Sequence, residues 1–176
     1  MIAIIRTGTV GLWRLAGHID TRAQTLSAHR QFEWFFQHIR LDDGYIARLI
    51  VDIMGLSGKP WHLALDRTNW KFRRRHVNIL MLGIVHGKVC IPLFWVLLGK
   101  VGNSNARERT ELVGWLCEVF PEQPVASLSG DREFIGERWM NWLHERGITF
   151  VLRLKENMFA WCSGLPGKGV GGADQV

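Results

Sequence analysis

The chain is poor in cysteine and has no apolar run long enough for a membrane. Its three cysteines are widely spaced and form no Cys-x-x-Cys or cysteine–histidine pattern of a zinc site, so we expect buried free thiols of a reducing cytoplasm. The apolar stretch at residues 89–98 is too short to span a bilayer and contains Pro92. The first six residues are too short for the core of a signal peptide. These absences predict a cytoplasmic protein with no membrane partner.

The chain is instead rich in apolar residues and carries a positive net charge. Apolar residues make up 47% of its 176 residues, which predicts a packed core rather than disorder. The length predicts one domain, with room for part of a second. The net charge of +6 favours a polyanionic partner, which is a nucleic acid or an anionic membrane surface. A basic surface with no partner is the alternative.

Helical spacing dominates the first third of the chain, and strands follow. Apolar positions three and four residues apart predict helices at residues 29–39 and 45–54. We then expect strands at 61–66, 76–86, 89–98, 125–129 and 148–154, and helices at 105–120 and 136–146. Gly87 begins a hairpin turn, and residues 68–75 are expected to be a polar, basic connection. The order β-β-β-α-β-α-β predicts an α/β fold with a mixed sheet and helices on its faces.

Two aspartates follow two of the expected strands. Asp66 closes the first apolar run, and Asp131 closes the run at residues 125–131. Taken singly, each is typical of a turn after a strand. Taken together on strands of this order, they favour a pair of hard oxygen ligands for Mg²⁺ or Mn²⁺, which could activate a water at a phosphodiester.

A basic stretch of the sequence directly follows Asp66. Residues 67–76 interleave Trp70 and Phe72 with arginine and lysine, so phosphate contacts and stacking on an unpaired base are both expected. Two further cations lie along the last strand. An exposed charged hairpin and a solvated edge strand are the respective alternatives. The candidate DNA-contacting residues are Lys71, Arg73, Arg74, Arg75, Arg153 and Lys155.

Several separate blocks of the sequence resemble, in the same order, bacterial insertion-sequence transposases of the "IS-four" family. The resemblance covers about residues 20–160, and its blocks are residues 65–70, 78–80, 102–104, 131–136 and 153–157. It implies a ribonuclease H-like core preceded by a helical DNA-binding segment. In that architecture the first and fourth strands are neighbours at the centre of the sheet, which would place the two aspartates side by side.

The resemblance also implies a reaction and roles for individual residues. Asp66 and Asp131 are similar to the first two acids of a DDE triad, and Arg132, Glu133 and Phe134 are expected to shape the site. In the family a water attacks a phosphodiester at the transposon end, and the freed 3′-hydroxyl attacks target DNA, with Mg²⁺ or Mn²⁺ as cofactor. The partner is therefore expected to be double-stranded DNA. The family's third acid, a glutamate on a later helix, has no counterpart here, so we expect a truncated copy with little or no activity.

These patterns divide the chain into three segments. We expect a helical, DNA-binding-like segment at 1–58, an incomplete catalytic core at 59–160 and a Gly-rich tail at 161–176. Absence of the last helices would leave one face of the sheet exposed. Two alternatives stay open: a non-catalytic DNA-binding or regulatory fragment, and a different ribonuclease H-like nuclease. The oligomeric state is also open, with a homodimer as one alternative.

Overall fold

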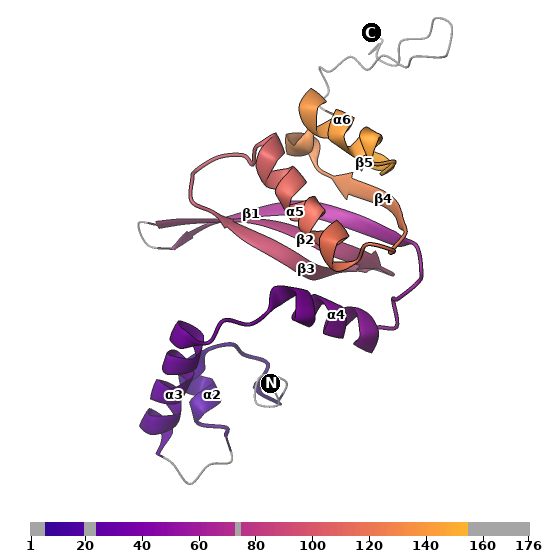
Figure 1. The fold of residues 1–176 in the computed structure, drawn as a ribbon. Coiled ribbons are helices and arrows are strands. Elements are labelled where there is room, and N and C mark those ends of the chain that lie inside the picture. Colours follow the sequence, from indigo (N-terminus) through magenta and orange to yellow (C-terminus); the bar gives the residue numbers. More distant parts are fainter. Residues whose placement is uncertain (1–5, 20–23, 73–74, 155–176) are drawn as a thin grey trace, which may run out of the picture. The chain divides into compact units, whose positions relative to one another are not determined.

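The computed structural model describes residues 6–19, 24–72 and 75–154 (Figure 1). By its contacts the chain divides into two compact units, Met1–Asp42 and Asp43–Val176. Among the described residues no helix is long and apolar enough to cross a membrane. The assignment of DNA binding to residues 1–58 and of catalysis to 59–160 stays a prediction, because compactness does not test what a segment does.

The first unit contains two described helices that pack on each other. They are α2 (Leu12–Ala16) and α3 (Thr25–His38). The ring of Trp13 meets the ring of His29 edge-on, with 5.2 Å between their centroids. The helix predicted at residues 29–39 is therefore present and begins earlier than its apolar spacing indicated.

A five-stranded mixed sheet forms the centre of the second unit. Its strands lie in the order β3-β2-β1-β4-β5, with β1, β2 and β3 antiparallel and β1, β4 and β5 parallel. This confirms the predicted mixed α/β class and the predicted neighbourhood of the first and fourth strands. The strand bounds are β1 (Trp61–Phe72), β2 (Arg75–His86), β3 (Val89–Leu98), β4 (Val125–Gly130) and β5 (Phe150–Leu152).

One face of the sheet carries the hydrophobic core. Along β1 the buried residues Trp61, Leu63 and Leu65 alternate with residues directed to the other face, as the pleat requires. Leu63 and Leu65 pair with Ile84 and Leu82 of β2, which are buried on the same face. Full burial of a leucine contributes about 1.5–3 kcal/mol, so this row holds β1 in register.

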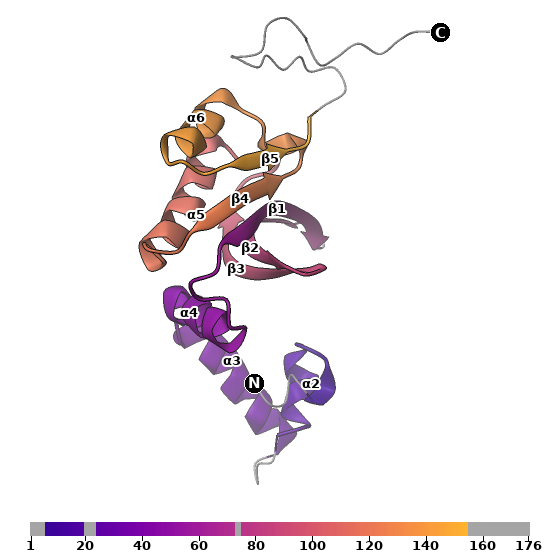
Figure 2. The ribbon, with the colours of Figure 1, turned by 90° about the vertical axis from the view of Figure 1, so that its right-hand side faces the viewer.

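Within the second unit, helices cover the core face of the sheet, and no helix among the described residues of this unit covers the other face. Figure 2 shows α5 (Ala106–Val119) and α6 (Glu137–Glu145) on the same side of the sheet, and α4 (Asp43–Ile53) adds buried residues to the same core. On the open face the side chains of Trp70, Leu97 and Val151 are 64–67% exposed.

The first hairpin is longer than the sequence predicted. Residues 68–72 continue β1 instead of leaving the sheet, and they pair with β2 down to Phe72 opposite Arg75. The prediction of a connection at residues 68–75 was therefore wrong. An antiparallel pair tolerates polar residues because one of its faces meets water, so polarity alone did not mark the end of the strand. Asp66 thus lies inside β1 rather than at its tip.

The cysteines also depart from the prediction. Cys90 is exposed and Cys117 is only partly buried, so the expectation of buried thiols is wrong for Cys90. Cys162 lies outside the described residues. Cys90 is exposed because no helix among the described residues of the second unit covers this face of the sheet. The Cys90 sulfur lies over Gly83 of β2.

Gly83 lacks room for a side chain. A Cβ added there would lie 2.6 Å from Sγ of Cys90 and 2.7 Å from the carbonyl oxygen of Ile91. We predict that Gly83→Ala lowers the free energy of unfolding by about 1–3 kcal/mol, because the backbone of β3 must move. Gly114→Ala in α5 is the matched control: its Cβ meets nothing within 4 Å, and alanine favours a helix, so stability should rise by up to about 1 kcal/mol. Urea unfolding of both variants measures this, and equal stabilities would contradict it.

Candidate active site

Each of the two aspartates comes one residue after the last pair of the parallel ladder between β1 and β4. The ladder between β1 and β4 ends with Leu65 opposite Gly130, and Asp66 and Asp131 are the next residues of their chains. A Cβ on Gly130 would point at Phe134 and Leu152 in the core, so the extended residue after it faces the open side, as Asp66 does. Neighbouring strands lie about 4.8 Å apart, so the sheet brings the two residues together.

Each aspartate uses one carboxylate oxygen in the same local hydrogen bond. Oδ1 of Asp66 accepts from the backbone N–H of Arg67, and Oδ1 of Asp131 accepts from that of Arg132, both at 2.8 Å. Both side chains are exposed. Asp131 also caps the short 3₁₀ helix η1 (Arg132–Phe134), so the turn role considered for it is real, whereas Asp66 caps nothing. Within the described residues, the other oxygen of each carboxylate accepts no hydrogen bond from the protein.

An ion pair joins the residues that follow the two aspartates. Nε of Arg67 donates to Oε1 and Oε2 of Glu133 at 2.9 and 3.0 Å, and its Nη2 donates to Oε2 at 2.7 Å. The Arg67 side chain is 13% exposed and that of Glu133 is 19% exposed. The hydrogen bond to Glu133 raises the pKa of Arg67, against the opposing effect of burial, and the charges of Glu133 and Asp66 raise it further. Glu133 is therefore tied to the residue after Asp66 through this ion pair, and its role in shaping a site stays a prediction.

Arg67 also reaches two asparagines that anchor the loop after β3. Its Nη1 donates to Oδ1 of Asn78 at 3.2 Å, and its Nη2 donates to Oδ1 of Asn103 at 3.3 Å. Asn78 is buried in β2, and its amide donates to the carbonyls of Lys100 and Gly102 at 3.1 and 2.8 Å. Four of the blocks that carry the resemblance, far apart in the sequence, therefore meet around one guanidinium.

Sequence reasoning missed Arg109, which supports this network from α5. The Arg109 side chain is buried and donates to Oγ of Ser104 at 2.9 Å, to the Ser104 carbonyl, and to the carbonyl of Glu133 at 3.1 Å. Its guanidinium carbon lies 5.2 Å from the centre of the buried Phe134 ring. Burial lowers the pKa of Arg109, and the charges of Glu133 and Glu108 oppose this. An arginine amid the polar positions of a helix is normally exposed, so no pattern in the sequence marked it.

The start of α5 is a capping box rather than an open anion site. Asn105 Oδ1 accepts from the backbone N–H of Glu108 at 2.9 Å, and Oε2 of Glu108 accepts from the backbone N–H of Asn105 at 2.7 Å. Asn105 is the N-cap residue of α5. Nζ of Lys100 lies 2.9 Å from the same Glu108 oxygen, which ties the loop to the helix.

The donor set suits a hard divalent cation. Two carboxylates with one uncommitted oxygen each, at neighbouring positions facing solvent, match Mg²⁺, which keeps several waters and takes only one or two protein carboxylates. Among the described residues no group of three or more His, Cys, Asp and Glu side chains is placed to hold a metal. Glu133 is the nearest acid in sequence to Asp131, but Arg67 occupies both of its oxygens.

The described DNA-contact candidates lie at the same end of the sheet as the aspartates. Lys71 and Trp70 are exposed on β1, and Lys71 lies about 17 Å beyond Asp66 at the rise of a strand. Arg153 follows β5, is exposed, and donates its backbone N–H to the Gly130 carbonyl at 3.2 Å. Arg75 begins β2. Arg73, Arg74 and Lys155 lie outside the described residues.

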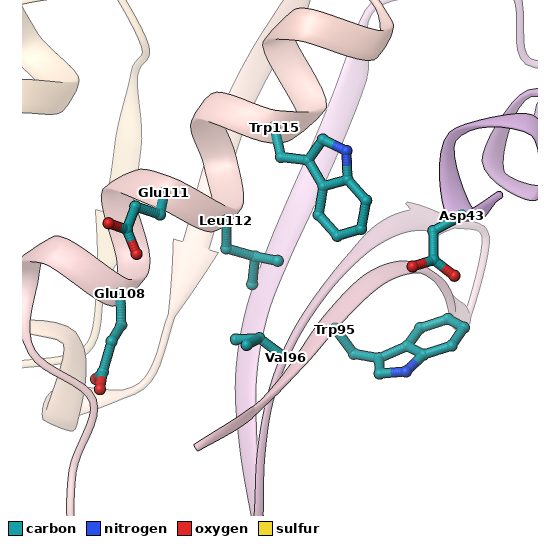
Figure 3. Close-up of a pocket in the computed structure, with 7 residues that line it drawn as sticks. All are labelled: Asp43, Trp95, Val96, Glu108, Glu111, Leu112 and Trp115. Atoms are coloured by element: carbon teal, nitrogen blue, oxygen red, sulfur yellow. The ribbon is translucent and has the colours of Figure 1, made fainter. Parts of the chain in front are cut away.

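A cavity of about 330 Å³ lies between α4, β3 and α5 (Figure 3). Two of its three carboxylates are already bonded: Glu108 to Lys100, and Glu111 to Nε of Arg107 at 2.6 Å. The cavity contains neither Asp66 nor Asp131 and is not part of the site. Its lining residues are Asp43, Trp95, Val96, Glu108, Glu111, Leu112 and Trp115.

Comparison with known proteins finds a distant likeness among solved structures. No protein-family model matches the sequence, and no curated protein sequence matches it. Among solved structures, the chain is similar to the catalytic domain of Mos1 mariner transposase, with 10% sequence identity and a TM-score of 0.39. The match covers 64% of this chain and 62% of that one. The fold class above rests on the sheet topology of this chain.

The capping box predicts a specific pH dependence of stability. Burial acts to raise the pKa of Glu108, but the hydrogen bonds from Lys100 and Asn105 and the nearby cations outweigh it and lower the pKa below the ordinary 4.5. The folded state then binds fewer protons than the unfolded state, so the stabilisation is full above pH 4.5 and is lost as the pH falls through the lower, folded value.

We therefore predict that Glu108→Gln loses less stability than the parent chain when the pH falls below about 4.5. The glutamine keeps the capping geometry but cannot titrate. Urea unfolding at a series of pH values measures the difference. Glu118→Gln, which removes an exposed carboxylate from the same helix, controls for net charge. Parallel stability curves for Glu108→Gln and the parent would contradict the prediction.

Proposed function

We propose that this chain is a DNA-binding polypeptide of the DDE transposase type, in which Asp66 and Asp131 hold a divalent cation against a DNA phosphodiester. One observation carries the proposal: the β1–β4 ladder ends so that both carboxylates follow the same rung on the same face of the sheet. Turn aspartates that served only their own loops would need no such shared position. The "IS-four" resemblance of the surrounding blocks supports the same function.

Individual residues of the chain take distinct roles in this proposal. Asp66 and Asp131 would bind Mg²⁺ or Mn²⁺ through the oxygens that their local hydrogen bonds leave unused. When bound, such an ion activates a water and stabilises charge on the phosphodiester. Lys71 and Arg153 would contact phosphates on either side of the carboxylates, and the exposed ring of Trp70 offers a face for a base.

The finer proposal is hydrolysis at transposon ends followed by strand transfer to target DNA. Two carboxylates give fewer ligands than a DDE triad supplies, and no third joins them among the described residues. We therefore propose metal and DNA binding by this chain, with little or no strand transfer by these residues alone.

The metal site is tested by Mn²⁺ titration followed by electron paramagnetic resonance. We expect Asp66→Asn and Asp131→Asn each to weaken Mn²⁺ binding at least tenfold, because each removes one of two charged ligands. Asp43→Asn, which removes an exposed carboxylate at the start of α4, should leave the affinity unchanged. Equal Mn²⁺ affinity in all four proteins would refute the metal site.

A non-catalytic DNA-binding fragment is the second candidate, favoured by the exposed cations at this end of the sheet. It requires DNA contact but no metal pair. Under either function, we predict that Lys71→Gln weakens duplex DNA binding several-fold and reduces the slope of log affinity against log salt by about 1.

Gel-shift titrations at several salt concentrations measure this effect. Lys88→Gln is the matched control, because Lys88 lies in the β2–β3 turn at the opposite end of the sheet and the change in charge is the same. A loss of affinity that is equal in the two variants would show that net charge, not this surface, drives binding. Salt-sensitive DNA binding without aspartate-dependent Mn²⁺ binding would favour the non-catalytic function.

A further inference from the structure

Backbone pairing between β1 and β4 ends one residue before Asp66 and Asp131. The last rung of the ladder is Leu65 opposite Gly130. Beyond it β1 runs on beside β2 as far as Phe72, whereas the chain after β4 turns into η1 and α6. No further backbone pairing between β1 and the residues after Gly130 is present in the described structure. The ladder thus brings the two segments together up to that rung, and beyond it the contacts that join them are made by side chains.

The Arg67–Glu133 pair spans this gap. Arg67 is the residue after Asp66, and Glu133 is two residues after Asp131, so the pair bridges the two segments where the ladder has ended. Its three hydrogen bonds fix both the distance and the orientation of the planar guanidinium relative to the carboxylate. Partial burial of both side chains limits the competition from water.

Both residues of the Arg67–Glu133 ion pair make further hydrogen bonds. Arg67 is held by Asn78 and Asn103, and the Glu133 backbone is held by Arg109. Arg67 pairs with Leu80 on the core face, while Asp66 faces the open side. The pair therefore lies behind the carboxylates, where it can orient them without joining them as a ligand.

We propose that the Arg67–Glu133 ion pair is the positioning device that sets the separation of Asp66 and Asp131, so that the affinity of the carboxylate pair for a divalent cation depends on it. This inference rests on the proposed metal site and adds to it two residues that touch neither the metal nor the DNA. The backbone N–H of Arg67 also orients Asp66 directly, so a shift of Arg67 moves that carboxylate.

The test uses substitutions that keep every charge. Arg67→Lys replaces the planar guanidinium with a single ammonium group, and Glu133→Asp shortens the side chain that carries the carboxylate. Each substitution therefore breaks the hydrogen-bonding geometry of the pair and retains the electrostatic field at the metal. We expect each to weaken Mn²⁺ binding by about three- to tenfold. The double variant should be no weaker than the poorer single variant, because the two residues act as one unit.

A control separates positioning from general loss of stability. Val51→Ala creates a cavity in the buried face of α4, away from the bridge, and should destabilise the fold without changing Mn²⁺ affinity. All titrations are made below the unfolding transition, with circular dichroism confirming a folded protein. A fall in affinity for Val51→Ala equal to that for Arg67→Lys would overturn the positioning role.

The remaining outcomes also separate the inference from the proposed function. If Mn²⁺ binding requires Asp66 and Asp131 but is unchanged by Arg67→Lys and Glu133→Asp, the inference fails and the metal site stands. If Arg67→Lys tightens binding, Glu133 is itself a ligand that Arg67 restrains, and the positioning role is wrong. If Mn²⁺ binding does not require the aspartates, the proposed function fails and the inference fails with it.

Discussion

The parallel ladder between β1 and β4 is the constraint on which the rest of this structure depends. It joins segments that are more than sixty residues apart, and its last rung decides which residues come next to each other. The buried leucines Leu63, Leu65 and Leu128 hold it in register, because a slip by one residue would turn this row out of the core. The positions of Asp66 and Asp131 are thus a consequence of hydrophobic packing one rung away.

Beyond the last rung of the ladder, polar side chains join the two segments. Around Arg67 the side chains of Glu133, Asn78 and Asn103 replace the backbone ladder, and Arg109 closes the network from α5. Such groups are expensive to leave unpaired when buried, so the network is held in one arrangement once the helices cover it. The same end of the sheet therefore combines a rigid, satisfied polar interior with two solvent-facing carboxylates, which is the arrangement that a preorganised cation site requires.

The open face of the sheet carries exposed apolar side chains. Exposed Trp70, Leu97 and Val151 lie on the face that also carries Asp66, and no helix among the described residues of the second unit lies over them. In most α/β folds such a face is covered, because apolar side chains gain from leaving water. The surface beside the proposed metal site is therefore partly apolar, and an exposed ring such as that of Trp70 suits stacking on a base.

The sequence by itself determined the element order, the mixed sheet and the two acidic positions, because apolar periodicity and turn residues act locally. It could not decide where β1 ends, since an antiparallel strand with one wet face accepts polar residues such as Thr68 and Lys71. It marked Glu133 only through the "IS-four" resemblance, and it gave no sign of Arg109. Those contacts join residues from different elements, and only the tertiary structure brought them together: the ladder placed the two aspartates side by side, and the network around Arg67 placed Glu133 and Arg109 behind them.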